Sequence, residues 1–228
     1  MKIKVINTGF FSVNSLVVFL DEKNVFVVDP ACCSEANDQN VILDFLAQNN
    51  LVLCGIFLTH GHFDHIAGTK ILKNAFPNVK IACHKNDSFM AGENAFFAQK
   101  KTLFQMGLSE ILPSLKNLPK IDVEFAGGEK LDSVFSSSDE KLSFLLSEWK
   151  IFHTPGHTQG SSVLYNPEQK ILISGDTVFY HSYGRTDLPY GNESQMQKSL
   201  DFIYKNILPD TKVFPGHDYF GFELKENF

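Results

Sequence analysis

Thr59-His60-Gly61-His62-Phe63-Asp64-His65 places three histidines and one aspartate within six residues, directly after the apolar run 53–58. Burial of three imidazoles beside a carboxylate without a cation would leave ring nitrogens and an anion short of partners, at a cost of roughly several kcal/mol. A bound metal ion removes that cost. The cluster therefore predicts a metal site, whereas an isolated histidine near a strand would be read as a structural residue.

Three further candidate ligands each follow a short apolar run that is predicted to be a strand, and Gly or Pro stands close to each of them. They are His157, Asp176 and His217, after the runs 149–152, 170–173 and 212–214. Glycine and proline permit the sharp turns that aim a side chain from a strand end into a shared cleft. We expect these side chains to meet the 60–65 cluster, and we expect Asp29, which ends another apolar run, to orient that cluster by hydrogen bonding.

The composition fits a single globular domain over residues 1–228, because 43% hydrophobic residues and 22 phenylalanines can form a large core. A formal charge of −6 argues against a nucleic-acid partner, which would require clustered Lys and Arg. The N-terminal segment lacks the apolar core of a signal peptide, and no stretch has the roughly 18 apolar residues of a membrane span. We therefore expect a cytoplasmic protein that acts on a small molecule, with no nucleic-acid or membrane partner; its oligomeric state stays open.

Apolar periodicity predicts strands and helices in an order that fits two packed β-halves covered outside by helices. Strands are expected at 3–8, 16–20, 25–28, 53–58 and 79–83 besides the three ligand-bearing runs, and helical segments at 38–48, 66–76, 87–118 and 195–207. The Ser-rich stretch 133–140 is expected to be a flexible hairpin or loop insertion, because its small polar residues cannot bury a core face.

The order of these ligand signatures resembles the metallo-β-lactamase superfamily and, within it, the glyoxalase II-like (hydroxyacylglutathione hydrolase-like) hydrolases. The likeness extends to Gly175-Asp176-Thr177-Val178-Phe179 and to Gly184-Arg185-Thr186-Asp187-Leu188-Pro189, which is similar to the short, single-domain bacterial branch. The resemblance implies an α+β fold, the four-layer αβ/βα sandwich. Only eleven residues follow His217, so we expect no separate C-terminal helical domain and a reduced glutathione pocket.

The resemblance also implies a ligand set and a reaction. One metal ion would be held by His60, His62 and His157, another by Asp64, His65 and His217, with Asp176 bridging both. The implied activity is that of a dinuclear metal-dependent thioester hydrolase, in which metal-bound hydroxide attacks a glutathione thioester such as S-D-lactoylglutathione. Asp64 and Asp176 are the candidate catalytic residues. Imidazole and carboxylate ligands suit zinc, with iron or manganese as alternatives.

Arg185 is the candidate substrate-binding residue, because it is the basic residue of the 184–189 motif and a guanidinium suits a glutathione carboxylate. The competing interpretation is an internal ion pair with Asp187 or another acid.

Four alternatives to thioester hydrolysis stay open at this point. The persulfide dioxygenases share the fold and a similar Gly-Arg-Thr-Asp motif, but use one iron on residues that match His60, His157 and Asp176. Tyr183 stands where those enzymes usually have Cys, and all ligands for a second metal are present, which favours hydrolysis. Lactonase and β-lactamase activities are further hydrolytic options, and a non-catalytic metal-binding scaffold is an alternative of another class.

Overall fold

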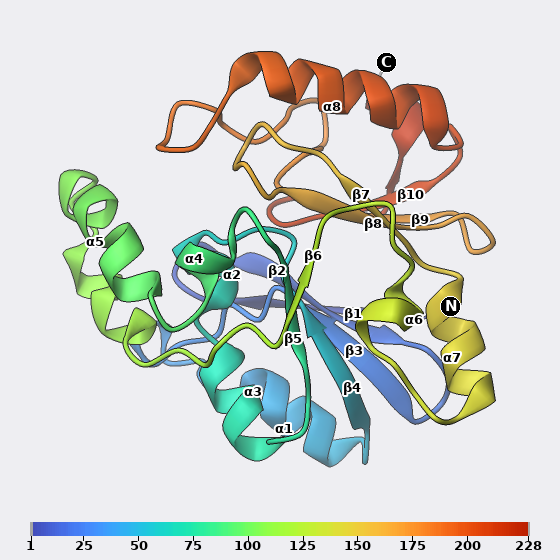
Figure 1. The fold of residues 1–228 in the computed structure, drawn as a ribbon, viewed down its shortest axis with the longest axis horizontal. Helices are drawn as coiled ribbons and strands as arrows, with labels where there is room; N and C mark the ends of the chain where they lie inside the picture. Colours follow the sequence, from blue (N-terminus) through green and yellow to red (C-terminus); the bar gives the residue numbers. More distant parts are fainter. Residues whose placement is uncertain (1, 228) are drawn as a thin grey trace.

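Two β-sheets packed face to face, with helices on their outer faces, make up residues 2–227, the part of the chain that the computed structural model describes (Figure 1). The first sheet runs in chain order: β1 (Ile3–Thr8), β2 (Val13–Phe19), β3 (Asn24–Val28), β4 (Val52–Phe57), β5 (Ile81–His84) and β6 (Val123–Phe125). The second has the order β11 (Phe222–Glu223), β10 (Lys212–Pro215), β9 (Ile171–Gly175), β8 (Ser162–Asn166) and β7 (Lys150–His153). The β3 to β6 pairings and the β9–β10 pairing are parallel, and the others are antiparallel.

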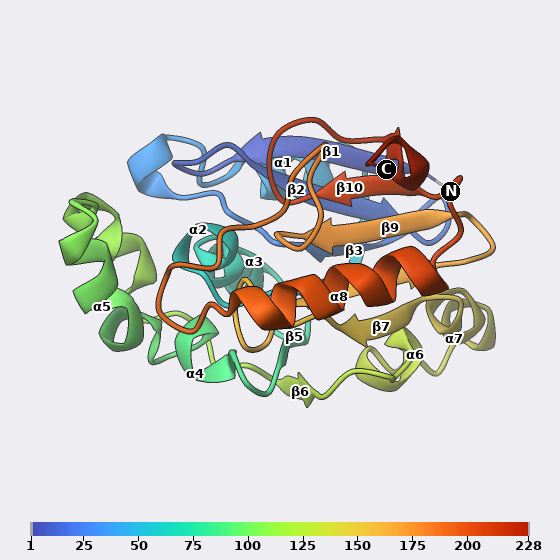
Figure 2. The same ribbon diagram turned by 90° about the horizontal axis from the view of Figure 1, so that it is seen from above.

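Helices cover the outer face of each sheet, which completes the expected four-layer αβ/βα sandwich (Figures 1 and 2). The α-helices are α1 (Val41–Gln48), α2 (Phe63–Ile66), α3 (Thr69–Ala75), α4 (Ser88–Ala91), α5 (Ala95–Gln105), α6 (Leu131–Val134), α7 (Glu140–Ser147) and α8 (Glu193–Asn206). Short 3₁₀ turns are η1 (Ser34–Ala36), η2 (Ser109–Leu115) and η3 (Leu224–Asn227). None of the helices within residues 2–227 has the length and apolar composition needed to cross a bilayer.

Strand β3 shows why the sequence folds in layers. Val25 and Val27 pack in the cluster shared with α1 and α3, while Phe26 and Val28 point to the other sheet. A strand buried on both faces is apolar at every position, so its run is continuous and does not alternate. Between the sheets, the Phe26 ring meets the Trp149 ring edge to face at a centroid distance of 5.5 Å. On the opposite side of the molecule, α8 buries its apolar stripe on the second sheet.

The helix expected over 66–76 is observed as α3, while Ile66 ends α2, and the two helices are separated by Ala67 and Gly68. A Cβ on Gly68 would lie 2.5 Å from the Cys32 sulfur, so this turn packs against the loop that follows β3. The turn separates α2, which carries two candidate ligands, from α3, which packs on the first sheet.

The Ser-rich stretch 133–140 contains a loop at 136–139, as expected, but the expectation that it buries no part of a core face is wrong. Val134 ends α6, and both Val134 and Phe135 are buried in the core between the sheets. The Phe135 ring occupies the space beside Gly55, where a Cβ would lie 2.6 Å from it. Asp139 then caps α7 by accepting a hydrogen bond from the Leu142 N–H at 3.1 Å. Two apolar side chains within the polar run therefore decide its structure.

Candidate metal centre

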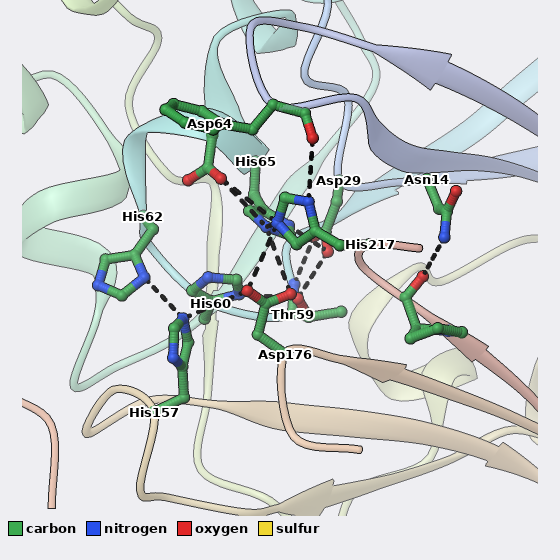
Figure 3. Close-up of polar contacts among 12 residues, drawn as sticks. Asn14, Asp29, Thr59, His60, His62, Asp64, His65, His157, Asp176 and His217 are labelled. Carbon is green, nitrogen blue, oxygen red and sulfur yellow. Dashed lines mark hydrogen bonds and ion pairs between the residues drawn. The ribbon is translucent and has the colours of Figure 1, made fainter. Parts of the chain in front are cut away.

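All seven candidate ligands meet at one edge of the sandwich, where strands of both sheets end (Figure 3). The 60–65 cluster follows β4 of the first sheet and continues into α2. His157 lies in the loop after β7, Asp176 directly after β9, and His217 two residues after β10. Because β9 and β10 are parallel neighbours, their ends lie side by side, and Gly216 N–H donates to the Gly175 carbonyl at 2.9 Å. A Cβ on Gly216 would overlap the Asp176 carboxylate, so glycine is required there.

The ligand atoms fall into two triads. Those of His60, His62 and His157 all lie within 4.8 Å of one another, as do those of Asp64, His65 and His217. Within the first triad, His62 Nδ1 lies 2.8 Å from His157 Nε2. Ring nitrogens from distant parts of a chain converge in this way on a shared cation. The triads match the two sets expected from the sequence, and their assignment to two ions stays a prediction.

Asp176 lies between the triads (Figure 3). Its Oδ2 is 3.4 Å from His157 Nε2 on one side and 3.6 Å from His217 Nε2 on the other, and its Oδ1 is 3.5 Å from His65 Nε2. Asp176 Oδ1 and His60 Nε2 are buried, and neither has a hydrogen-bond partner among residues 2–227. Buried polar atoms are normally paired, so these two orphans fit coordination of a metal ion.

The opposite ring nitrogen of four histidines is engaged by a group outside the triads. His157 Nδ1 donates to the Arg185 carbonyl at 2.7 Å, and His217 Nδ1 donates to the Phe11 carbonyl at 3.2 Å. The other two pairs are His60 Nδ1 with Thr59 Oγ1 at 3.1 Å and His65 Nδ1 with Asp29 Oδ2 at 2.9 Å. A carbonyl can only accept, so the contacts of His157 and His217 place the lone pair of Nε2 on the inward side, as metal binding requires.

Asp29 orients the cluster as expected. Its carboxylate accepts from Thr59 N–H at 2.8 Å and from the Thr59 hydroxyl at 2.6 Å, besides contacting His65. Asp29, His60 and His65 also form a third compact set of ligand-type atoms. Because the Asp29 carboxylate already accepts hydrogen bonds from its neighbours, we assign it to the support of the ligands.

Electrostatics differ between the triads. Burial lowers the pKa of His60 and His62 well below the usual range, and neighbouring imidazoles lower it further, so both rings stay in the neutral form that binds metal. Burial also lowers the pKa of His65, but the surrounding carboxylates, Asp176 foremost, outweigh it and raise that pKa to about 10. The second triad therefore favours a positive charge at its centre, which a metal ion supplies when it replaces the proton.

Asp87 is a supporting residue that the sequence analysis missed. It is fully buried, and its carboxylate accepts from Gly61 N–H at 2.9 Å, Gly160 N–H at 2.7 Å and the Thr158 hydroxyl at 2.6 Å. Burial raises the pKa of Asp87, and these hydrogen bonds act in the opposite direction. One carboxylate thus joins the loop of the first sheet to the loop that carries His157. Its place just beyond the apolar run that forms β5 was the available signal.

Gln99, on α5, is a second residue that the sequence did not reveal. Its side-chain oxygen accepts from Phe63 N–H at 3.0 Å, and its side-chain nitrogen donates to the carbonyls of Gly61 at 2.9 Å and Met90 at 2.8 Å. The buried amide therefore attaches the projecting helix α5 to the ligand-bearing loop (Figures 1 and 2). A single glutamine in a helical segment carries no sequence signal for this role.

A cavity of about 360 Å³ opens above the triads, and Arg185 lies in its wall. The Arg185 guanidinium makes two hydrogen bonds to the Asp187 carboxylate, both at 2.7 Å, so the internal ion pair considered from the sequence is present. Both side chains are more than half exposed, and such surface pairs are worth about 0–1 kcal/mol. An incoming carboxylate can therefore compete for Arg185, whose role in substrate binding stays a prediction.

Replacing Asp64 with alanine is expected to lower the metal content from about two ions per chain to about one. The substitution removes a ligand from the second triad and leaves His60, His62 and His157 intact with Asp176. Elemental analysis of dialysed protein measures this directly. Asp218→Asn is the matched control, because it removes an exposed charge next to His217 without removing a candidate ligand. An unchanged content of two ions in Asp64→Ala would remove Asp64 from the ligand set.

Comparison with known proteins gives consistent findings. The sequence profile described as Metallo-beta-lactamase superfamily matches residues 8–217. An uncharacterised protein of Aquifex aeolicus is 33% identical over 219 residues, which cover 95% of this chain and 90% of that protein. Hydroxyacylglutathione hydrolase GloC of Haemophilus influenzae is 28% identical over 220 residues, 95% of this chain and 91% of that one. Among solved structures, the BLEG-1 B3 metallo-beta-lactamase has a TM-score of 0.78 at 23% identity and covers 99% of this chain and 95% of its own, a likeness of fold.

Proposed function

This chain belongs to the metallo-beta-lactamase superfamily, and from that membership we propose that it is a dinuclear metal-dependent hydrolase of thioesters, with glutathione thioesters such as S-D-lactoylglutathione as substrates. The observation that carries the proposal is the pair of triads beneath one cavity, with the Asp176 carboxylate between them. The relative named hydroxyacylglutathione hydrolase, which matches over 95% of the chain, supports the choice of thiol. Zinc is the proposed metal, with iron or manganese as alternatives for the same donors.

The residues of the chain divide the chemical work. The two triads with Asp176 would hold the metal ions, which when bound would lower the pKa of a water to near 7 and polarise the scissile carbonyl. Burial raises the pKa of Asp64, but His65 and the hydrogen bond with His217 outweigh it, so the pKa is lowered and the side chain stays a carboxylate. Asp64 therefore acts as an anion at the cavity floor and not as a proton donor. A thioester suits such a floor, because a thiol with a pKa near 8.5 can leave as the thiolate.

Arg185 gives a prediction on substrate binding. Arg185→Ala is expected to raise KM for glutathione thioesters several-fold with a smaller change in kcat, the pattern of lost uniform binding. Asp187→Asn is expected to act in the opposite direction, because it releases the guanidinium from its two 2.7 Å hydrogen bonds. Steady-state kinetics on a glutathione thioester and on a small neutral thioester separate the effects. Equal losses of kcat on both substrates in Arg185→Ala would make the residue structural, a role its carbonyl already has toward His157.

One assay tests the proposed function against its alternatives. Protein loaded with zinc, and separately with iron, is mixed with S-D-lactoylglutathione under nitrogen, and loss of the thioester is followed by absorbance. Turnover without oxygen is the expected result. A parallel electrode measurement with glutathione persulfide detects oxygen consumption. Oxygen uptake by the iron form together with negligible thioester turnover would establish the persulfide dioxygenase alternative, and no turnover in either assay would favour the metal-binding scaffold.

A further inference from the structure

The lining of the cavity above the triads includes large apolar side chains beside the candidate ligands. They are Phe11, Phe63, Met106, Phe179 and Leu188. Phe63 is buried, but Phe11 is 40% exposed and Met106 is 37% exposed. Large apolar side chains left open inside a concave site gain free energy when a ligand covers them. These five side chains are called the apolar wall below.

The apolar wall is held in place relative to the triads. The Phe11 ring meets the Phe63 ring edge to face at a centroid distance of 5.7 Å, and the Phe11 carbonyl accepts from His217 Nδ1 at 3.2 Å. Met106 directly follows α5, and Gln99 of this helix makes hydrogen bonds with the backbone of Gly61 and Phe63, next to the candidate ligands. Phe11 and Met106 are therefore both fixed to loops that carry candidate ligands. If the scissile carbonyl lies above the triads, we expect the attached acyl group to lie beside these two side chains.

Charge in the cavity does not by itself set the acyl preference. Among the described residues that line it, Arg185 is the one with a basic side chain other than histidine, and Asp187 already neutralises it. The remaining charged residues of the lining, Asp64, Asp176 and Asp218, are acidic. Two divalent ions held by the triads would carry four positive charges and outweigh these three carboxylates. A carboxylate on the acyl chain is instead disfavoured because it would lose hydration against the apolar wall, whereas a neutral apolar chain gains contact area there.

We propose that the natural substrate carries a neutral, apolar acyl group longer than lactoyl, roughly four to eight carbons, which lies against Phe11, Met106 and Leu188. This inference rests on the proposed thioester hydrolysis and specifies its acyl side. In the reaction, water forms the new C–O bond, the C–S bond breaks with its electron pair on sulfur, and the products are a carboxylate and a thiol. The acyl chain is not changed chemically and contributes binding.

A series of S-acylglutathiones tests the proposal with the metal-loaded full chain. The acetyl, butanoyl, hexanoyl and octanoyl thioesters share one thiol, so kcat/KM reports the acyl side alone. Burial of methylenes against the wall is expected to raise kcat/KM by about two- to fourfold for each CH₂ up to the cavity limit. S-succinylglutathione has the four-carbon chain of the butanoyl compound with the terminal methyl replaced by a carboxylate, and it is expected to be at least about tenfold poorer than the butanoyl compound.

Two variants locate the effect. Phe11→Ala and, independently, Met106→Ala are expected to flatten the dependence of kcat/KM on acyl chain length. Met106 follows the end of a projecting helix, so its truncation leaves the core intact. Phe97→Ala is the matched control, because Phe97 lies on the same helix, is 78% exposed and does not line the cavity. It is expected to keep the wild-type slope.

The outcomes separate the two proposals. A flat wild-type series with ready hydrolysis of S-D-lactoylglutathione overturns the apolar acyl group and leaves thioester hydrolysis in place. A rising series that Met106→Ala and Phe11→Ala both leave unchanged also overturns it, because the wall would not be the binding surface. If neither the series nor S-D-lactoylglutathione is hydrolysed, thioester hydrolysis itself fails and the acyl inference fails with it; if S-D-lactoylglutathione alone is hydrolysed, only the acyl inference fails.

Discussion

Asp176→Ala is expected to lower kcat/KM for thioester hydrolysis by at least about 10³-fold and to reduce the metal content of the purified chain. The reason is its position: one carboxylate contacts ring nitrogens of both triads, at 3.4 Å to His157, 3.5 Å to His65 and 3.6 Å to His217. Its loss would leave two ions without a shared anion between them. Stopped-flow or steady-state kinetics with parallel elemental analysis measures both effects.

Asp176→Asn sharpens this experiment, because the amide keeps an oxygen and the shape of the side chain but removes the charge. We expect the asparagine variant to retain more metal than Asp176→Ala while losing most of the activity. Asp201→Ala, on the exposed side of α8, controls for the loss of a carboxylate elsewhere. Two bound ions and wild-type turnover in Asp176→Ala would refute the bridging role.

Asp87→Ala is expected to reduce the free energy of unfolding by about 3–5 kcal/mol, a large fraction of the stability of an ordinary domain. The substitution leaves two buried N–H groups, those of Gly61 and Gly160, without an acceptor, and it removes the carboxylate partner of the Thr158 hydroxyl, which keeps its contact with Ser161 Oγ at 2.8 Å. Each unpaired buried donor costs about 1–3 kcal/mol, partly offset where the structure relaxes. Urea unfolding of metal-free wild type and variant, both in chelator, isolates this effect from metal binding.

Thr158→Val supplies a graded control for this prediction, because it removes one of the three donors and keeps the carboxylate. Its expected cost is about 1 kcal/mol. Exposed Asp201→Ala is expected to stay within about 0.5 kcal/mol of wild type. If Asp87→Ala unfolds at the same urea concentration as the Asp201 variant, the hydrogen bonds of Asp87 between the two loops do not contribute to the free energy of unfolding.

The parts of the fold that could be predicted are those where apolar runs are long. Strand β3 is apolar at four consecutive positions, 25–28, and was recognised because a strand covered on both faces leaves this pattern. Strand β8 was missed because only Val163, Leu164 and Tyr165 are apolar, between Ser162 and Asn166. Strand β6 has three residues, one of them Glu124. Short strands of mixed polarity are set by their neighbours in the sheet, which the sequence does not show.

The residues of the candidate site also differ in how far the sequence predicts them. The seven candidate ligands could be found because each follows a strand and its residue type suits a metal ion. The residues that hold the candidate ligands in place by hydrogen bonding could be predicted only in part. Asp29 stands at a strand end, but the partners of Asp87 lie 26 and 73 residues away from it, and their approach depends on how the two sheets pack. The ion pair of Arg185 and Asp187 is local, yet the sequence alone could not choose between it and a free guanidinium.

Both triads take ligands from both sheets, since His157 and His217 follow strands of the second sheet while the other members follow β4 of the first. A bound ion therefore acts as a reversible cross-link between the halves of the molecule. A ligand that binds only the folded chain adds about 2.7 kcal/mol of stability at a free concentration of 100 times its Kd. Resistance to proteolysis should then follow metal supply, so that molecules starved of metal are degraded first and the surviving population is enriched in loaded enzyme.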